Sequence, residues 1–305
     1  MRIQKINVYQ KDPDNCVSNQ YKTGDLSLDG LGVHLINGCR GQGKSYLMSK
    51  ILAQCAKERT YDIVYLISPS AQSNSAYFGK YIDKENIFKP DRDAIDIVVK
   101  LVENDRDEFE AYLEDVKRYE DLMVNINSIS DDVLFNAYEE GYINEKCQPV
   151  KPVWKYKEVR PPCSALILDD CLTSDALLKS TSKNTISTIG TYNRHLASLK
   201  EPHSNRSACG LSLYMLVQSY SCQNGIPRML REQLTALTTF KVKQEKQLSK
   251  IKEEVSNVID LEKFDSAYNY AVNKPHGSLT ISFNPKRPEL TFRAGLDELI
   301  LFDEK

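Results

Sequence analysis

Eight consecutive residues of this 305-residue chain have the types and spacing of a phosphate-binding loop. They match the pattern G-x-x-x-x-G-K-[ST] and are Gly38, Cys39, Arg40, Gly41, Gln42, Gly43, Lys44 and Ser45. Tyr46 follows directly. Glycines let such a loop turn its backbone N–H groups toward phosphate, and the next helix directs its positive end at the same anion. We expect residues 38–46 to bind ATP, with Lys44 at the β- and γ-phosphates and the Ser45 hydroxyl on Mg²⁺.

Two adjacent carboxylates, Asp169 and Asp170, follow the apolar run at 166–168. Ligands bind at the carboxyl ends of strands in α/β sheets, so both side chains are candidates for the same site. We expect Asp169 to hold Mg²⁺ through water, and Asp170 to orient or deprotonate the water that attacks the γ-phosphate. The alternative for Asp170 is to cap the turn that follows.

Other polar residues after the acidic pair are candidates to complete the site. Gln218 follows the apolar run at 211–217 and is expected to sense the γ-phosphate or position the water, unless it is only a solvated strand end. Phosphoryl transfer often also uses an arginine from a neighbouring subunit, because charge develops on the γ-phosphate. The candidates are Arg194, in a helical segment, and Arg228 and Arg231, at the start of a short helix. Any of them could instead form a surface ion pair, and Arg231 is the first to test.

The elements around these residues predict an α/β fold. An apolar strand at 32–37 precedes the loop, helical spacing of apolar residues covers 44–57, and a second apolar strand lies at 62–67. Strand, helix and strand within so short a distance form a βαβ unit, which requires a parallel sheet. Further core strands are predicted at 164–168, 211–217 and 234–242.

The chain divides into three parts by composition. Residues 1–30 are a polar lead-in with a short apolar alternation at 3–8, and residues 31–242 hold the ATPase core. The polar stretch at 91–162 is predicted to be an insertion in that core, containing an exposed amphipathic helix at 103–120. It is either a solvated decoration or a contact for a subunit or partner. Residues 243–305 are predicted to form a helical and β-hairpin appendage, with strands at 277–283 and 289–292.

Composition narrows the function classes. The chain is 41% hydrophobic and 27% charged with a net charge of −2, so any contact with nucleic acid must be local. No apolar run is long enough for a membrane span, and the N-terminus has no signal-peptide run. The eight cysteines have no C-x-x-C spacing, which favours free thiols in a reducing compartment over a zinc cluster. The four histidines lack metal-ligand spacing.

Taken in order, the motifs resemble one family. Besides the loop, they are Tyr65-Leu-Ile-Ser-Pro69, Leu168-Asp-Asp-Cys171, Asn193-Arg-His195, Val217-Gln-Ser219 and Ile226-Pro-x3-Arg231. Over residues 30–242 the chain resembles the viral genome-packaging ATPases of the FtsK–HerA superfamily, of the poxvirus, giant-virus, virophage and polinton type. The Asp-Asp pair departs from the Asp-Glu of cellular relatives but suits the viral branch. The resemblance does not extend to the 91–162 stretch, which we do not match to the family.

The resemblance implies a RecA-like P-loop NTPase with helices on both faces of a mainly parallel sheet. It implies a ring, expected to be a hexamer, around double-stranded DNA, with ATP hydrolysis driving DNA into a capsid. Partners would be the DNA, other subunits and capsid vertex proteins, in the host cytoplasm or a viral factory and in association with the virion.

Two other readings remain open on the sequence. A cellular or plasmid-borne DNA-pumping or helicase ATPase of the same superfamily would share each catalytic residue and lack a capsid partner. A non-motor nucleotide switch or scaffold is less favoured, because the guanine motif N-K-x-D is absent where Asn273-Lys274 is followed by Pro275. The acidic pair also argues for hydrolysis.

Overall fold

The structure is a computed structural model that describes residues 28, 31–70, 75–126, 128–171, 185–220 and 226–302. Of the predicted lead-in at 1–30, the structure describes only residue 28, so the alternation predicted at 3–8 lies outside the described residues. Over the described ranges, no helix combines the length and apolar character needed to cross a membrane.

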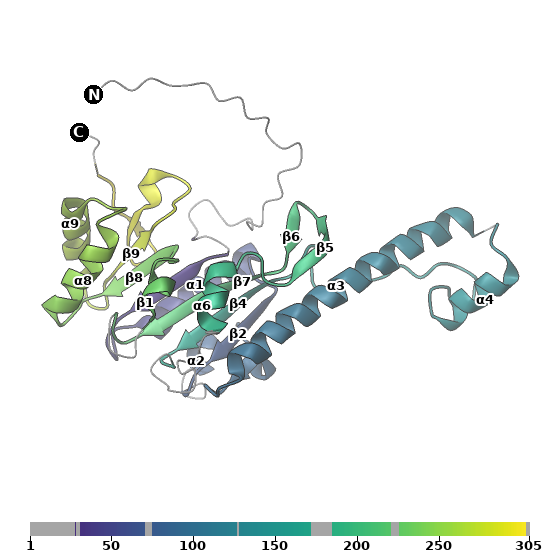
Figure 1. The fold of residues 1–305 in the computed structure, drawn as a ribbon, viewed down its shortest axis with the longest axis horizontal. Coiled ribbons are helices and arrows are strands. Elements are labelled where there is room, and N and C mark those ends of the chain that lie inside the picture. The colour runs from purple at the N-terminus through teal and green to yellow at the C-terminus, as the bar shows by residue number, and fades with distance from the viewer. Residues whose placement is uncertain are drawn as a thin grey trace, which may run out of the picture.

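A nine-stranded sheet in the order β11-β10-β9-β8-β1-β7-β4-β2-β3 forms the centre of the molecule (Figure 1). Its parallel strands are β1 (Val33–Asn37), β2 (Ile63–Ile67), β3 (Ile87–Phe88), β4 (Cys163–Asp169), β7 (Gly210–Val217) and β8 (Ala236–Phe240). The antiparallel strands are β9 (Ser278–Ser282), β10 (Phe292–Ala294) and β11 (Glu298–Leu299). The predicted α/β class with a mainly parallel sheet is confirmed, and the short edge strands β3 and β11 are additions to the prediction.

Helices cover both faces of the sheet, which explains why its central strands are apolar throughout. In β4 all seven residues are buried, with Leu166 and Leu168 facing one helical layer and Ala165 and Ile167 the other. The first layer holds the start of α3, and α6 (Thr185–Tyr192), α7 (Arg228–Arg231), α8 (Glu245–Val255) and α9 (Leu261–Val272). The second layer holds α1 (Lys44–Glu58) and α2 (Ser75–Phe78). Short 3-10 helices are η1 (Lys84–Asn86) and η2 (Pro288–Leu290).

The C-terminal segment shares the main sheet. Strand β9 pairs with β8 along its whole length, and α9 packs on β9 and β10. A tight turn at Gly277 leads from α9 into β9, where a Cβ atom would lie 2.1 Å from the Ala271 carbonyl oxygen. Only glycine therefore fits this turn, which the sequence marks with Pro275 and Gly277.

Helix α3 (Ala94–Asn125) is 32 residues long and begins at Ala94, not at residue 103 as predicted. Its first turns are part of the main core, since Ala94, Ile95, Val98 and Val102 pack against the sheet. The rest projects from the body together with α4 (Asp131–Glu139), as Figure 1 shows. We refer to residues 103–150, which make up this projection, as the arm.

A second, two-stranded sheet braces the base of the arm and was not predicted. It consists of β5 (Ser198–His203) and β6 (Arg206–Ala208) and leads directly into β7. The Phe109 ring of α3 lies edge-on to Trp154 and to His203, with centroid distances of 5.0 and 5.3 Å. Lys200 of β5 is 3.3 Å from Glu110.

Candidate nucleotide site

The glycine-rich loop runs from the end of β1 into α1. Its first residue is tied to the neighbouring strand, because the Gly38 N–H donates to the Val217 carbonyl at 3.0 Å. Gly41 and Gly43 have φ values of 81° and 107°, a region that side chains with a Cβ rarely adopt. Gly43 caps α1, and the Leu47 N–H donates to its carbonyl. The remaining N–H groups of a first helical turn have no helical partner, which makes this end an anion site.

Lys44 lies between the loop and the acidic pair. Its side chain is buried, and Nζ donates to the Gly38 carbonyl at 2.9 Å and lies 3.8 Å from Asp170 Oδ1. A buried lysine held by a loop carbonyl and a carboxylate has its charge where a phosphate group would enter. The structure thus places Lys44 between the loop and Asp170, and its predicted contact with phosphate stays a prediction.

Gln42 braces the loop against the next strand. Its Oε1 accepts from the Cys39 N–H at 2.5 Å and its Nε2 donates to the Lys241 carbonyl at 2.8 Å. Arg40 is exposed on the wall of the cavity above the loop, and Tyr46 is also exposed there. Of the predicted nucleotide-binding residues, six line this cavity: Arg40, Gly41, Gly43, Lys44, Ser45 and Tyr46.

The acidic pair lies near the loop because β7 pairs in parallel with β4 on one side and with β1, which precedes the loop, on the other. The Asp170 N–H donates to the Leu216 carbonyl at 3.1 Å, and Asp170 adopts a φ of 50°. Such a backbone conformation is unfavourable for a non-glycine residue and tends to occur at functional sites. Gln218 Nε2 donates to Asp170 Oδ2 at 3.0 Å. The structure therefore brings Lys44, Asp170 and Gln218 together at one edge of the sheet.

Ser45 and Asp169 line the same cavity and offer the oxygen atoms that Mg²⁺ prefers. Asp169 is 2% exposed, and its Oδ2 accepts from the Ser68 hydroxyl at 3.4 Å. A carboxylate that faces a cavity edge from a buried strand end, with a serine hydroxyl from the loop on the same wall, suits a hard divalent cation. The residues present therefore fit the predicted metal.

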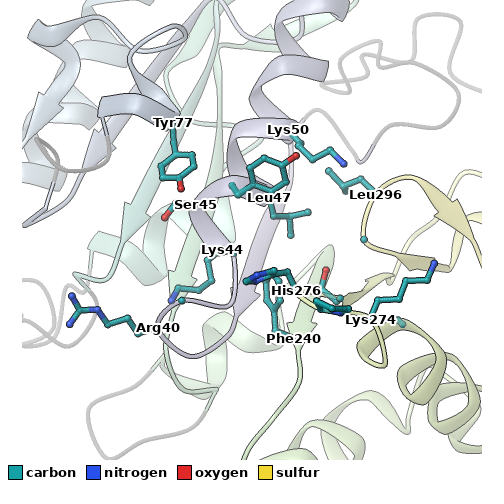
Figure 2. Close-up of a pocket in the computed structure, with 18 of the residues that line it drawn as sticks. Arg40, Lys44, Ser45, Leu47, Lys50, Tyr77, Phe240, Lys274, His276 and Leu296 are labelled. Atoms are coloured by element: carbon teal, nitrogen blue, oxygen red, sulfur yellow. The ribbon is translucent and has the colours of Figure 1, made fainter.

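The cavity has a volume of about 980 Å³ and extends from the loop to the C-terminal segment. Figure 2 shows Arg40 and Lys44 toward one end, Lys274 and Leu296 toward the other, and His276 and Phe240 between them. The Nδ1 atom of His276 is 3.1 Å from the Gln42 carbonyl oxygen, so the turn before β9 contacts the loop directly.

Two ion pairs line the C-terminal end of this cavity. Lys50 of α1 is 2.5 Å from Asp297, and Lys274 is 2.7 Å from Glu298. Sequence reasoning missed this wall. Pro275 and Gly277 marked a turn, but only the pairing of β9 with β8 brings that turn beside the loop.

The arginine candidates lie in three different environments. Arg231 is 10% exposed and forms a two-pronged ion pair with Glu254 of α8, with distances of 2.9 and 3.0 Å. Arg228 is 83% exposed and pairs with Glu232 one turn along the chain. The short helix predicted for both is present as α7.

Arg194 follows the end of α6, in a turn and not in the helix as predicted. The adjacent Asn193 carbonyl accepts from the N–H of Leu211, at the start of β7. At about 3.3 Å per strand residue this is roughly 23 Å from Gln218, which follows the end of β7. Arg194 is therefore remote from the site of its own chain.

The cysteines that the structure describes are all free thiols: Cys39, Cys55, Cys147, Cys163, Cys171 and Cys209. Burial, with Asp169 nearby, raises the pKa of Cys171 to about 12, so this thiol beside the acidic pair stays protonated. Within the described ranges, no cluster of histidine, cysteine and acidic residues has the geometry of a metal site.

A parallel sheet with a glycine loop between its central strand and α1, and an acidic pair at the end of β4, defines the P-loop NTPase fold. Solved structures with a similar arrangement include the genome packaging NTPase B204 from Sulfolobus turreted icosahedral virus 2 in complex with ATP-gammaS. It is 13% identical, with 87% of this chain and 96% of that chain covered and a TM-score of 0.45.

Two further solved structures are similar at the same level. The pCW3 conjugation coupling protein TcpA is 15% identical over 90% of this chain and 67% of its own, with a TM-score of 0.41. EssC from Geobacillus thermodenitrificans is 15% identical over 88% of this chain and 39% of its own, with a TM-score of 0.43. No protein-family model and no curated protein sequence matches the chain. At these identities, the functional evidence lies in the residues of the site itself.

Proposed function

We propose that this chain binds ATP with Mg²⁺ at the loop and hydrolyses it to ADP and phosphate. The observation that carries the proposal is the convergence of Lys44, Asp170 and Gln218 at the loop, with 3.8 Å between Lys44 and Asp170 and 3.0 Å between Gln218 and Asp170. A nucleotide-binding loop alone would need no carboxylate and amide at this edge. Together they supply what attack by water on the γ-phosphate requires.

The two ends of the cavity fix the proposed direction of the nucleotide. Asp170 and Gln218 come from β4 and β7 on one side of β1, so the γ-phosphate lies on that side. His276 and Leu296 come from the β9–β11 side, so the ribose and base extend that way. Leu296 offers apolar surface for the base, and the His276 ring offers a flat surface.

In this arrangement each residue has a distinct role. Lys44 neutralises charge on the β- and γ-phosphates, and Gln218 holds the Asp170 carboxylate in place while it orients the water. The water oxygen bonds to the γ-phosphorus, the bond to the ADP oxygen breaks, and Asp170 accepts the water proton. Ser45 and Asp169 would hold Mg²⁺, which when bound supplies further neutralisation of phosphate charge.

For the arginine from a neighbouring subunit we propose Arg228 in preference to Arg231. Arg231 forms a bidentate ion pair with Glu254, and it could reach a neighbouring subunit only if this ion pair broke. Arg228 is 83% exposed, at the start of α7, and pairs only with a residue that is itself exposed. Surface pairs of this kind contribute little, so the side chain is available to another subunit. Arg194 remains a second candidate, since a trans-acting residue need not lie near its own site.

We further propose that hydrolysis drives double-stranded DNA into a capsid, through a ring of subunits that acts in the host cytoplasm or viral factory. The family resemblance of the motifs supports this, and so does the distribution of charge. Residues 103–150 hold fourteen acidic and four basic side chains, a net charge of −10. Since the whole chain carries −2, the remaining residues carry +8, which favours contact with phosphate outside the arm.

The test is the rate of ATP turnover by the purified protein with and without double-stranded DNA. We expect DNA to raise the rate, and Lys44→Ala to abolish it in both conditions. Turnover that DNA leaves unchanged at low salt would contradict the motor and favour a non-motor P-loop enzyme. Stimulation by DNA without binding to capsid vertex protein would favour the DNA pump or helicase without packaging.

A mixing experiment tests Arg228. Arg228→Ala subunits should bind ATP but turn over slowly, and adding Lys44→Ala subunits, which keep Arg228, should restore part of the activity. Arg231→Ala is the matched comparison, because it removes an arginine one turn away. If mixing restores activity to Arg231→Ala and not to Arg228→Ala, the assignment is reversed.

A further inference from the structure

The end of the arm has exposed apolar side chains that do not pack within the arm itself. Leu122, Ala137 and Ile143 form a small core that holds α4 against the end of α3. A second set of apolar side chains points outward at the same end. We refer to this set as the tip; its members are 47–82% exposed and are Met123, Val124, Val133, Phe135 and Tyr138. Exposed large apolar side chains concentrated at one end of the arm mark a candidate interaction site, whereas single exposed apolar residues need no explanation.

The surface around the tip is strongly acidic. The net charge of −10 over residues 103–150 repels DNA, so the tip does not face the substrate proposed for the motor. Its partner must offer basic groups around an apolar contact. Acidic residues within reach of the tip include Asp121, Asp131 and Asp132, all exposed.

The arm is also fixed in direction. Asp105, buried in α3, accepts from Lys155 at 2.6 Å and from Tyr156 at 3.1 Å, which ties the returning chain to the helix. Phe109 packs on Trp154 and His203, as described above. A surface that is held in place before binding loses little conformational entropy on docking, so even a modest contact is effective.

We propose that the tip docks on the body of a second copy of this chain. The charges are complementary, since the residues outside the arm carry +8 against the −10 of the arm. The reach is sufficient, because α3 extends about 35 Å beyond Val102 at 1.5 Å per residue. A body of this size has a radius of gyration of about 18 Å, so an arm can extend across most of a neighbour. The inference goes beyond the proposed function, because it assigns a subunit contact that does not depend on the nucleotide chemistry.

The test compares the assembly of the full-length protein and its variants by analytical ultracentrifugation over a range of concentration and salt. Val124→Ser with Phe135→Ser removes two tip residues that are 82% and 62% exposed, so the fold should be unaffected. We expect at least a tenfold rise in the dissociation constant. Val258→Ser, at a residue 63% exposed between α8 and α9, is the matched control and should assemble as the wild type does.

A second variant tests the charges independently. Asp121→Lys with Asp131→Lys should weaken assembly at low salt, and the difference from wild type should shrink at high salt because exposed charges are screened. A photo-reactive phenylalanine analogue at position 135 should form cross-links between two copies that map to basic surface of the body. A monomeric wild type, unchanged assembly in both variants, or cross-links confined to one copy would overturn the proposal.

Binding of a fluorescent ATP analogue separates this proposal from the proposed function. The tip variants should bind the analogue as the wild type does, and Lys44→Ala should assemble normally. If wild-type protein assembles through the tip but binds no nucleotide, the proposed function fails and the docking proposal stands. The reverse result, with nucleotide binding and no role for the tip in assembly, leaves the enzyme in place and removes the docking contact.

Discussion

Replacement of Arg231 by alanine should destabilise the fold, because this arginine forms an ion pair with Glu254 of its own chain. It meets both oxygens of Glu254 at 2.9 and 3.0 Å, and the Tyr220 hydroxyl donates to the same carboxylate at 2.6 Å. The side chains of Arg231 and Glu254 are 10% and 24% exposed. Breaking a fully buried pair costs about 3–5 kcal/mol, and an exposed pair contributes about 0–1 kcal/mol. For this intermediate burial we expect a loss of about 2 kcal/mol.

The measurement is urea unfolding of nucleotide-free protein, followed by circular dichroism. The effect should depend on pH in a definite direction. Burial raises the pKa of Glu254, but hydrogen bonds from Arg231 and Tyr220 outweigh it and lower the pKa from its usual 4.5. The stabilisation is therefore complete above pH 4.5 and is lost as the pH falls through the lowered folded value. The gap between wild type and Arg231→Ala should narrow over that window.

Arg228→Ala is the control for this measurement, and it should unfold at the same urea concentration as the wild type because its side chain is exposed. The reasoning would be refuted by an Arg231→Ala protein that unfolds like wild type yet turns over ATP only when a neighbour supplies Arg231. That outcome would mean that the pair with Glu254 opens readily and that Arg231 reaches the nucleotide.

Three further predictions concern the site. Lys44→Ala should lower ATP turnover to background with little change in the unfolding transition. Measurable turnover by this variant would contradict the assignment of Lys44 to the phosphates. The Asp170→Asn protein should bind nucleotide but hydrolyse it about 10²-fold more slowly or worse, as expected for loss of a general base. The Asp169→Asn protein should instead need a higher Mg²⁺ concentration for half-maximal turnover. Equal small effects of the two changes would contradict this division of roles. His276→Ala should raise KM for ATP more than it lowers kcat, since His276 lies between the loop and the end of the cavity proposed for the base; a change in kcat alone would contradict this placement.

The part of the site that local sequence encodes could be predicted. The loop, Asp169, Asp170 and Gln218 each stand at the end of an apolar run, and buried parallel strands bring such ends to one edge of the sheet. This prediction needed only parallel strands, because their carboxyl ends lie at the same edge of the sheet; the order β1-β7-β4, which brings the three ends close together, comes from the structure.

The parts that long-range packing determines could not be predicted. The partner of Arg231 is Glu254, on a helix that follows another strand, so nothing near Arg231 in the sequence shows that it is already paired. His276 meets Gln42 across more than 230 residues. The early start of α3 is different, because Ala94, Ile95, Val98 and Val102 have helical spacing that could have been read. The charged residues that follow masked this pattern.

The pairing of β8 with β9 bears on how short a working fragment of this protein could be. Every motif residue lies before position 243, so a chain cut there would keep the loop, the acidic pair and the arginines. It would also uncover the edge of β8, whose five residues are all buried, together with the hydroxyl of Thr238 that meets Thr280 at 2.9 Å. An apolar strand with free backbone groups is a template for pairing with other chains. Such a fragment would precipitate rather than hydrolyse ATP, although a motif search would judge it complete.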